Sequence, residues 1–169
     1  MTNVAITDAL LPEFDHEMAV TRRLLERVPE ADLAWKPHDK SMSLGGLATH
    51  LSNLPTWAEQ ITQQTELDMD SIPPEARPKV PANRVGLLEM FDRNVAAARS
   101  RLAAMSDGEY LAAWTFKKGG RIVFTLPRIA ALRGFLMNHS IHHRGQLSVY
   151  LRLRNVALPA IYGPSADEG

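Results

Sequence analysis

The sequence predicts an all-α fold, a four-helix bundle with a long crossover connection, in one domain that spans residues 1–169. Four segments repeat apolar residues at intervals of three and four, which is typical of amphipathic helices. Little of the chain alternates as a strand would, and one proline-rich stretch is long enough to join helices that run in the same direction. A chain of 169 residues suits a single domain with one core.

The first predicted helix covers residues 8–28, where the apolar repeat is regular. A loop follows, in which Trp35 is expected to cover an edge of the core. The second helix is predicted from Ser43, a suitable N-cap, to about residue 64. Pro55 lies inside it, so we expect a kink there without an end to the helix.

Residues 65–83 contain four prolines and few apolar residues, which predicts a long connection across the outside. The third helix is expected over residues 84–105, where the alanine-rich half has high helix propensity.

The segment after the third helix predicts a short helical turn and irregular structure, with a turn at Gly119 and Gly120. Residues 121–126, "RIVFTL", alternate enough to form a short strand, but a lone strand has no partner. The fourth helix is predicted over residues 127–155, with Pro127 in the first turn, where a missing N–H costs nothing.

The composition excludes several classes of function. Nineteen basic residues balance nineteen acidic ones, so no overall charge favours nucleic acid. Arg144, Arg152 and Arg154 lie close together and could form a basic patch. However, a helical wheel of the fourth helix places Arg144 and Arg152 on the side away from the core, where exposed arginines are usual. We therefore expect no nucleic-acid partner.

Cysteine is absent, so any metal must be held by nitrogen and oxygen ligands. No apolar run approaches the length of a membrane span, and the N-terminal segment lacks the pattern of a secretory signal. The expectation is a cytoplasmic protein with no membrane partner.

The fourth helix carries an unusual set of polar residues on its inward face. At about 100° per residue, His139, His143, Gln146 and Tyr150 fall on the same side as the apolar residues of its first half, while His142 lies at the flank. Buried polar groups need partners, and a bound cation is one. Histidines at positions i and i+4 can converge on one ion, although this spacing alone is a weak signal.

A third histidine occupies the middle of an apolar face on the second helix. His50 aligns there with leucine, tryptophan and isoleucine. A single core histidine is more often satisfied by a carbonyl, but two others also face inward on another helix. We interpret His50, His139 and His143 as candidate metal ligands, with His142 as the geometric alternative to His143. His16 and His38 are excluded, because one faces solvent and the other lies in a polar loop.

Two stretches resemble the DinB family, also called DinB/YfiT-like metalloenzymes. Residues 136–168 contain the pattern HxxxHRGQ, followed by YLR and by P-x-x-YG, and residues 37–51 contain Ser-Met-Ser before a histidine. With the helix spacing, the likeness extends over essentially the whole chain.

The resemblance implies a four-helix bundle that holds a divalent metal, zinc or nickel, through three histidines. Carried over by position, the ligands are His50, His139 and His143. It also implies a homodimer and, from characterised relatives, thiol-dependent transferases and isomerases that use a low-molecular-weight thiol as cosubstrate.

Two functions follow as hypotheses. The first is a metal-dependent enzyme, a thiol-dependent S-transferase or a hydrolase-like enzyme, because three imidazoles leave coordination positions open. The second is a non-enzymatic, stress-inducible metal-binding dimer. The sequence assigns no catalytic residue. Gln146, Tyr150 and His142 are candidates for orienting a histidine or contacting a ligand, and closure of the polar end of the bundle explains Gln146 and Tyr150 equally well.

Overall fold

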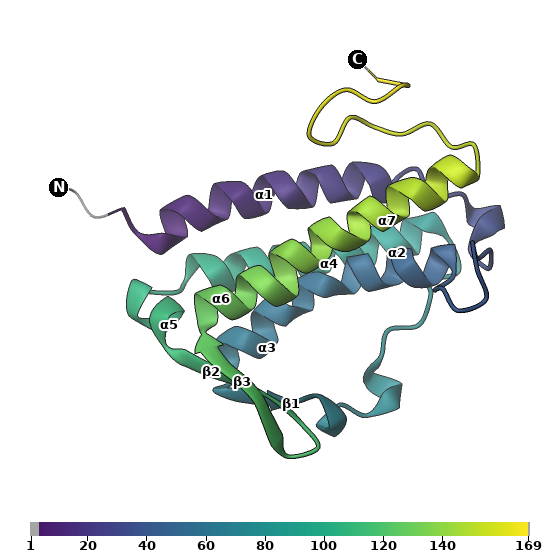
Figure 1. Cartoon of the computed structure of the whole chain (residues 1–169). Coiled ribbons are helices and arrows are strands. Elements are labelled where there is room, and N and C mark those ends of the chain that lie inside the picture. The colour runs from purple at the N-terminus through teal and green to yellow at the C-terminus, as the bar shows by residue number, and fades with distance from the viewer. Residues whose placement is uncertain (1–3, 169) are drawn as a thin grey trace.

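The computed structural model describes residues 4–168 and shows a mostly helical chain with a small sheet at one end (Figure 1). The all-α prediction is therefore wrong in one respect, because the described residues include a three-stranded sheet in the order β1-β2-β3.

The chain forms seven α-helices and three strands within residues 4–168. The α-helices are α1 (Ile6–Leu25), α2 (Leu44–Asn53), α3 (Trp57–Gln63), α4 (Arg84–Ala103), α5 (Asp107–Leu111), α6 (Arg128–Leu132) and α7 (His139–Leu153). The strands are β1 (Glu66–Asp68), β2 (Ala113–Lys118) and β3 (Arg121–Pro127).

The long helices lie side by side around one hydrophobic core. Helix α1 packs against α4 and α7, while α2 also packs against α4 and α7, so α7 has two helical neighbours. Figure 1 shows α1 and α2 on different sides of α7. Because α2 and α7 are neighbours, polar residues on their facing sides can meet.

Pro55 divides the predicted second helix. Helix α2 begins after the N-cap Ser43, whose hydroxyl accepts the N–H of Gly46, and ends at Asn53. A 3-10 turn at Leu54–Thr56 then leads into α3. Proline has no N–H to donate, so the chain passes it through a tighter turn and continues in helical form.

The predicted fourth helix is one helical run with a local change of winding. Between α6 and α7 the chain forms a π-helical turn, Arg133–Asn138, and His139 is the first residue of α7. A π-helical turn contains more residues than an α-helical turn, so it shifts which side chains face the core. Such turns occur often at functional sites.

The lone strand expected at residues 121–126 does have a partner, and this prediction was wrong. Strands β2 and β3 form an antiparallel hairpin, and β1 pairs with β2 in parallel. Gly119 and Gly120 connect the hairpin with φ angles of 57° and 76°. A two-residue turn with positive φ at both positions matches the twist of a hairpin, and glycine adopts it without strain. The carboxylate of Asp68 accepts hydrogen bonds from the N–H groups of both glycines.

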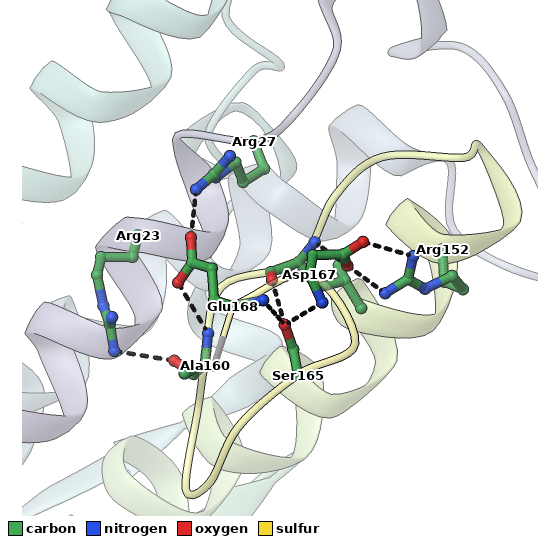
Figure 2. A network of polar contacts seen from close by, with 8 residues as sticks. Arg23, Arg27, Arg152, Ala160, Ser165, Asp167 and Glu168 are labelled. Atoms are coloured by element: carbon green, nitrogen blue, oxygen red, sulfur yellow. Dashed lines mark hydrogen bonds and ion pairs between the residues drawn. The ribbon is translucent and has the colours of Figure 1, made fainter.

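The C-terminal residues 154–168 fold back over α1 and α7 through polar contacts (Figure 2). Asp167 pairs with Arg152 of α7, and Glu168 pairs with Arg27 just beyond α1. The hydroxyl of Ser165 accepts the N–H groups of Asp167 and Glu168, which closes a tight loop. These contacts attach a segment with no helix or strand of its own to both helices.

Arg144 does not point into solvent as predicted. Its side chain is 1% exposed and pairs with the buried Glu17 of α1, at 2.6 Å between Nη2 and Oε2. The hydroxyl of Tyr162, from the C-terminal segment, lies within hydrogen-bonding distance of both. The other two arginines of the considered basic patch are also paired, Arg152 with Asp167 and Arg154 with Asp32.

Within residues 4–168, no helix combines the length and the apolar character needed to cross a membrane.

Candidate metal centre

The structure brings His50, His139 and His143 together between α2 and α7. Their nearest ring nitrogens all lie within 4.8 Å of one another, so these three side chains could hold a metal ion. His50 comes from the last turn of α2, and the other two lie one turn apart at the start of α7. His50 and His139 are half-buried, and His143 is buried.

The Nε2 atoms converge on a common point. Nε2 of His139 lies 2.8 Å from Nε2 of His143 and 3.3 Å from Nε2 of His50. Two nitrogens bound to one zinc ion, each at about 2.0–2.1 Å, are about 3.3 Å apart in tetrahedral geometry. The separation of His50 and His139 matches this value, and that of His139 and His143 is shorter.

A hydrogen bond with Gln146 fixes the tautomer of His143. Nδ1 of His143 lies 2.7 Å from Oε1 of Gln146, and an amide oxygen only accepts, so Nδ1 carries the proton. Nε2 of His143 therefore presents its lone pair to Nε2 of His139, which lies 2.8 Å away. A backbone hydrogen bond with Phe135 raises the pKa of His139, against the larger lowering by burial.

The electrostatics of the cluster keep the rings neutral. Burial lowers the pKa of His50 to about 4, with a further contribution from His143 and His139. Burial also lowers the pKa of His139 and of His143, partly offset at His143 by the hydrogen bond with Gln146. Only the neutral imidazole can donate a lone pair to a metal, so these shifts favour the ligating form at neutral pH.

These residues fit a cation. Nε2 of His139 and Nε2 of His143 lie 2.8 Å apart, and a shared cation would be bound by both nitrogens in this arrangement. Three neutral nitrogen donors suit zinc, nickel and other divalent transition metals. The donor set does not distinguish among these metals.

The other candidates from the sequence differ in their placement. Gln146 is exposed and contacts His143 through its amide oxygen. His142 is exposed, with its ring centroid 4.8 Å from that of His143. Tyr150 packs edge-on against Trp35 at 5.7 Å, so the structure gives it a packing contact at the edge of the core. Trp35 is itself partly buried against the core, as predicted.

The two excluded histidines, His16 and His38, are both exposed and lie outside the three-histidine cluster. Their exclusion agrees with the structure.

A pocket of about 350 Å³ adjoins the cluster between β3 and the helical run that leads into α7. Its lining consists of Phe124, Leu126, Ala130, Ala131, Gly134, Phe135 and His139. His139 therefore belongs both to the three-histidine cluster and to the pocket wall. The pocket was not expected from the sequence, because two of its seven lining residues, Phe124 and Leu126, come from a strand that was expected to have no partner.

The buried pair of Arg144 and Glu17 was also missed. It lies directly beside the cluster in sequence, since Arg144 follows His143, and it links α7 to α1. The HRGQ pattern contained this arginine, but one sequence gives no indication that a second face of α7 is buried.

Comparisons with known proteins agree with this architecture. The sequence model of the DinB family matches residues 1–169. An uncharacterised protein, YrdA of Bacillus subtilis, is 27% identical over 164 residues, which cover 95% of this chain and 90% of that protein.

Two crystal structures are similar in fold. A DinB-like protein from Bacillus cereus gives a TM-score of 0.73 at 21% identity, with 94% of this chain and 98% of that chain covered. The DinB-like protein YjoA from Bacillus subtilis gives 0.68 at 20% identity, with 93% and 99% covered. The family match over the full length shows that this chain belongs to the DinB family.

Proposed function

We propose that this member of the DinB family is a metal-dependent enzyme, with its site built on two neighbouring helices, α2 and α7. The proposed ligands are His50, His139 and His143. The proposed metal is zinc or nickel, as the family resemblance implies. The observation that carries the proposal is the convergence of three histidines from α2 and α7, whose ring nitrogens lie within 4.8 Å of one another.

The proposed reaction is transfer of a low-molecular-weight thiol to an electrophile. When bound, a divalent ion with three neutral ligands would keep its full charge and an open position, and would lower the pKa of a thiol placed there. The thiol sulfur attacks the electrophilic carbon, a C–S bond forms, the leaving group departs with its electron pair, and the thiol proton goes to solvent.

The chain's own residues prepare the site for this chemistry. Burial of the three rings holds them in the neutral form, and Gln146 orients His143 so that its Nε2 points inward. Outer hydrogen bonds of this kind commonly set the orientation and basicity of metal-ligating histidines. Among residues 4–168, no carboxylate belongs to the cluster, so these three ligands would not cancel the ion's positive charge.

Metal content tests the site. Protein purified without a nickel column is expected to contain one metal ion per chain, measured by plasma mass spectrometry, and His50→Ala is expected to lose it. His16→Ala is the matched control, because His16 is exposed on α1 and outside the cluster. Metal that is far below one per chain and unchanged by His50→Ala would disprove the site.

Turnover tests the reaction. With 1-chloro-2,4-dinitrobenzene as electrophile and glutathione or cysteine as thiol, we expect release of chloride and absorbance of the thioether only in the metal-loaded protein. His139→Ala should abolish both, and His38→Ala, at an exposed position, should not. A metal-loaded protein that is strongly stabilised by its metal but converts no pair of thiol and electrophile would favour the non-enzymatic binding module.

We also propose that the chain forms a homodimer, as the family resemblance implies. Sedimentation velocity at micromolar concentration would show a species of twice the chain mass, and a single monomeric species at all concentrations would contradict it.

A further inference from the structure

We propose that the pocket beside His139 holds an apolar group of the substrate, either a single aromatic ring or a short alkyl chain. The substrate's polar head would then lie at the three-histidine cluster. This inference rests on the proposed function and names the class of substrate that the site accepts.

The lining of the pocket selects for apolar groups. Apart from His139, every residue that lines it is apolar or glycine, and none carries a charge. A polar substituent placed there would lose its hydrogen bonds to water and gain few in return. The one polar residue lies where the pocket meets the cluster, so the pocket offers an apolar end and a metal-binding end.

Aromatic packing keeps one wall of the pocket in place. The rings of Phe124 and Phe135 are 5.8 Å apart, and Trp57 of α3 stacks on Phe135 with centroids 4.5 Å apart. Phe116 of β2 contacts both phenylalanines, at 5.4 and 5.2 Å. These contacts join the sheet to the helices, so the wall is preformed.

Small residues leave the opposite side of the pocket open. Ala130, Ala131 and Gly134 lie on the helical run, and no heavy atom would come within 4 Å of a Cβ atom added at Gly134. Glycine has low helix propensity, and tighter packing does not account for it here. A larger side chain at this position would extend into the pocket, so its absence keeps the space available.

The size of the pocket fits part of a small molecule. Its volume of about 350 Å³ is at the low end of the range of about 300 to 1,000 Å³ for small-molecule sites. It is too small for a helix or a strand of a partner protein. Each methylene that enters an apolar site should tighten binding by about fourfold.

The experiment uses the Co²⁺-substituted protein and a series of n-alkanethiols from ethanethiol to hexanethiol. The visible spectrum of Co²⁺ reports binding of the thiol at the metal. For the wild type, Kd is expected to fall three- to fourfold per methylene until the pocket is full. For Gly134→Leu, Kd should be nearly independent of chain length, while Co²⁺ affinity and the spectrum stay unchanged.

Gly145→Leu is the matched control. Gly145 is an exposed glycine of α7 that also has no atom within 4 Å of an added Cβ, and it does not line the pocket. Both changes replace an exposed glycine of the same helical run by leucine, and because Gly145 lies outside the pocket, this control should keep the dependence on chain length. Ala130→Asp, at an exposed position of the pocket rim, provides a second variant and should weaken hexanethiol more than ethanethiol.

Toluene binding to the metal-free protein, followed by NMR, separates the two proposals. If Co²⁺ does not bind but toluene binds to the wild type and to Gly145→Leu and not to Gly134→Leu, the proposed function fails and the apolar pocket stands. If Co²⁺ binds and chain length has no effect in the wild type, the pocket proposal is overturned. It is also overturned if Gly134→Leu keeps the dependence of Kd on chain length, or if the only effect of Gly134→Leu is to change the oligomeric state.

Discussion

Replacing Arg144 by methionine should lower the free energy of unfolding by about 3–5 kcal/mol, because it leaves the carboxylate of Glu17 buried without its cation. The two side chains are only 1% and 8% exposed, so water cannot replace the lost partner. Methionine keeps most of the volume, so the loss reports the charge and the hydrogen bonds. For a chain of this length, the change corresponds to a fall in Tm of about 6–20 °C.

Urea denaturation followed by circular dichroism measures the effect, with Arg152→Met as the control. Arg152 also belongs to α7 and pairs with Asp167, but these side chains are 45% and 27% exposed, so its loss should cost about 0–1 kcal/mol. The double variant Arg144→Met with Glu17→Leu removes both charges and should recover most of the stability. Equal losses for Arg144→Met and Arg152→Met, or a double variant no more stable than Arg144→Met, would refute the reasoning.

Three further predictions concern the cluster and the glycines. Gln146→Leu should weaken metal binding about 10–100-fold, measured by competition with a chromophoric chelator, and leave the Tm of the metal-free protein unchanged. The Tm of the metal-free protein should fall as the pH is lowered from about 6.5 to 4. In this range the histidines of the unfolded chain bind protons, whereas the buried rings of the folded chain, whose pKa is lowered, stay neutral. His50→Ala should make the Tm depend less steeply on pH. Gly45→Ala should destabilise by about 1–3 kcal/mol in urea denaturation, since its Cβ would lie 2.9 Å from Cγ1 of Val80, whereas Gly145→Ala should stabilise by up to about 1 kcal/mol.

The helices could be predicted because their signals are local. The N-cap at Ser43 and the proline at position 55 each act within one turn of the chain. The structure confirms the N-cap, whereas at Pro55 α2 ends at Asn53 and a 3-10 turn leads into α3, where a kink without an end was expected. The sheet could not be predicted as easily, since β2 reads as irregular when taken alone. Its partner is specified by the two-glycine turn, so Gly119 and Gly120 between two short apolar segments were the signal that could have identified the hairpin.

The proximity of the three histidines could be predicted from the sequence, because each of them occupies the otherwise apolar face of its helix. Within α7 the winding is regular, so the spacing of His139 and His143 places them on one side, as the wheel requires. A helical wheel assumes a constant number of residues per turn, so it does not describe the preceding π-helical turn. The pocket lined by Gly134 and Phe135 depends on that turn and on the hairpin, so it was not predictable.

The error at Arg144 has a geometric cause. A helical wheel identifies one apolar face, which is sufficient for a helix with one neighbour, but α7 packs against both α2 and α1. The face toward α2 carries the histidines, and the face toward α1 is closed by an ion pair and by the C-terminal segment. Arg144 follows His143 directly, so anchoring its guanidinium to α1 fixes the rotation of α7 about its axis. The same rotation directs the two histidines of α7 toward His50, so the buried ion pair helps to position the three-histidine cluster.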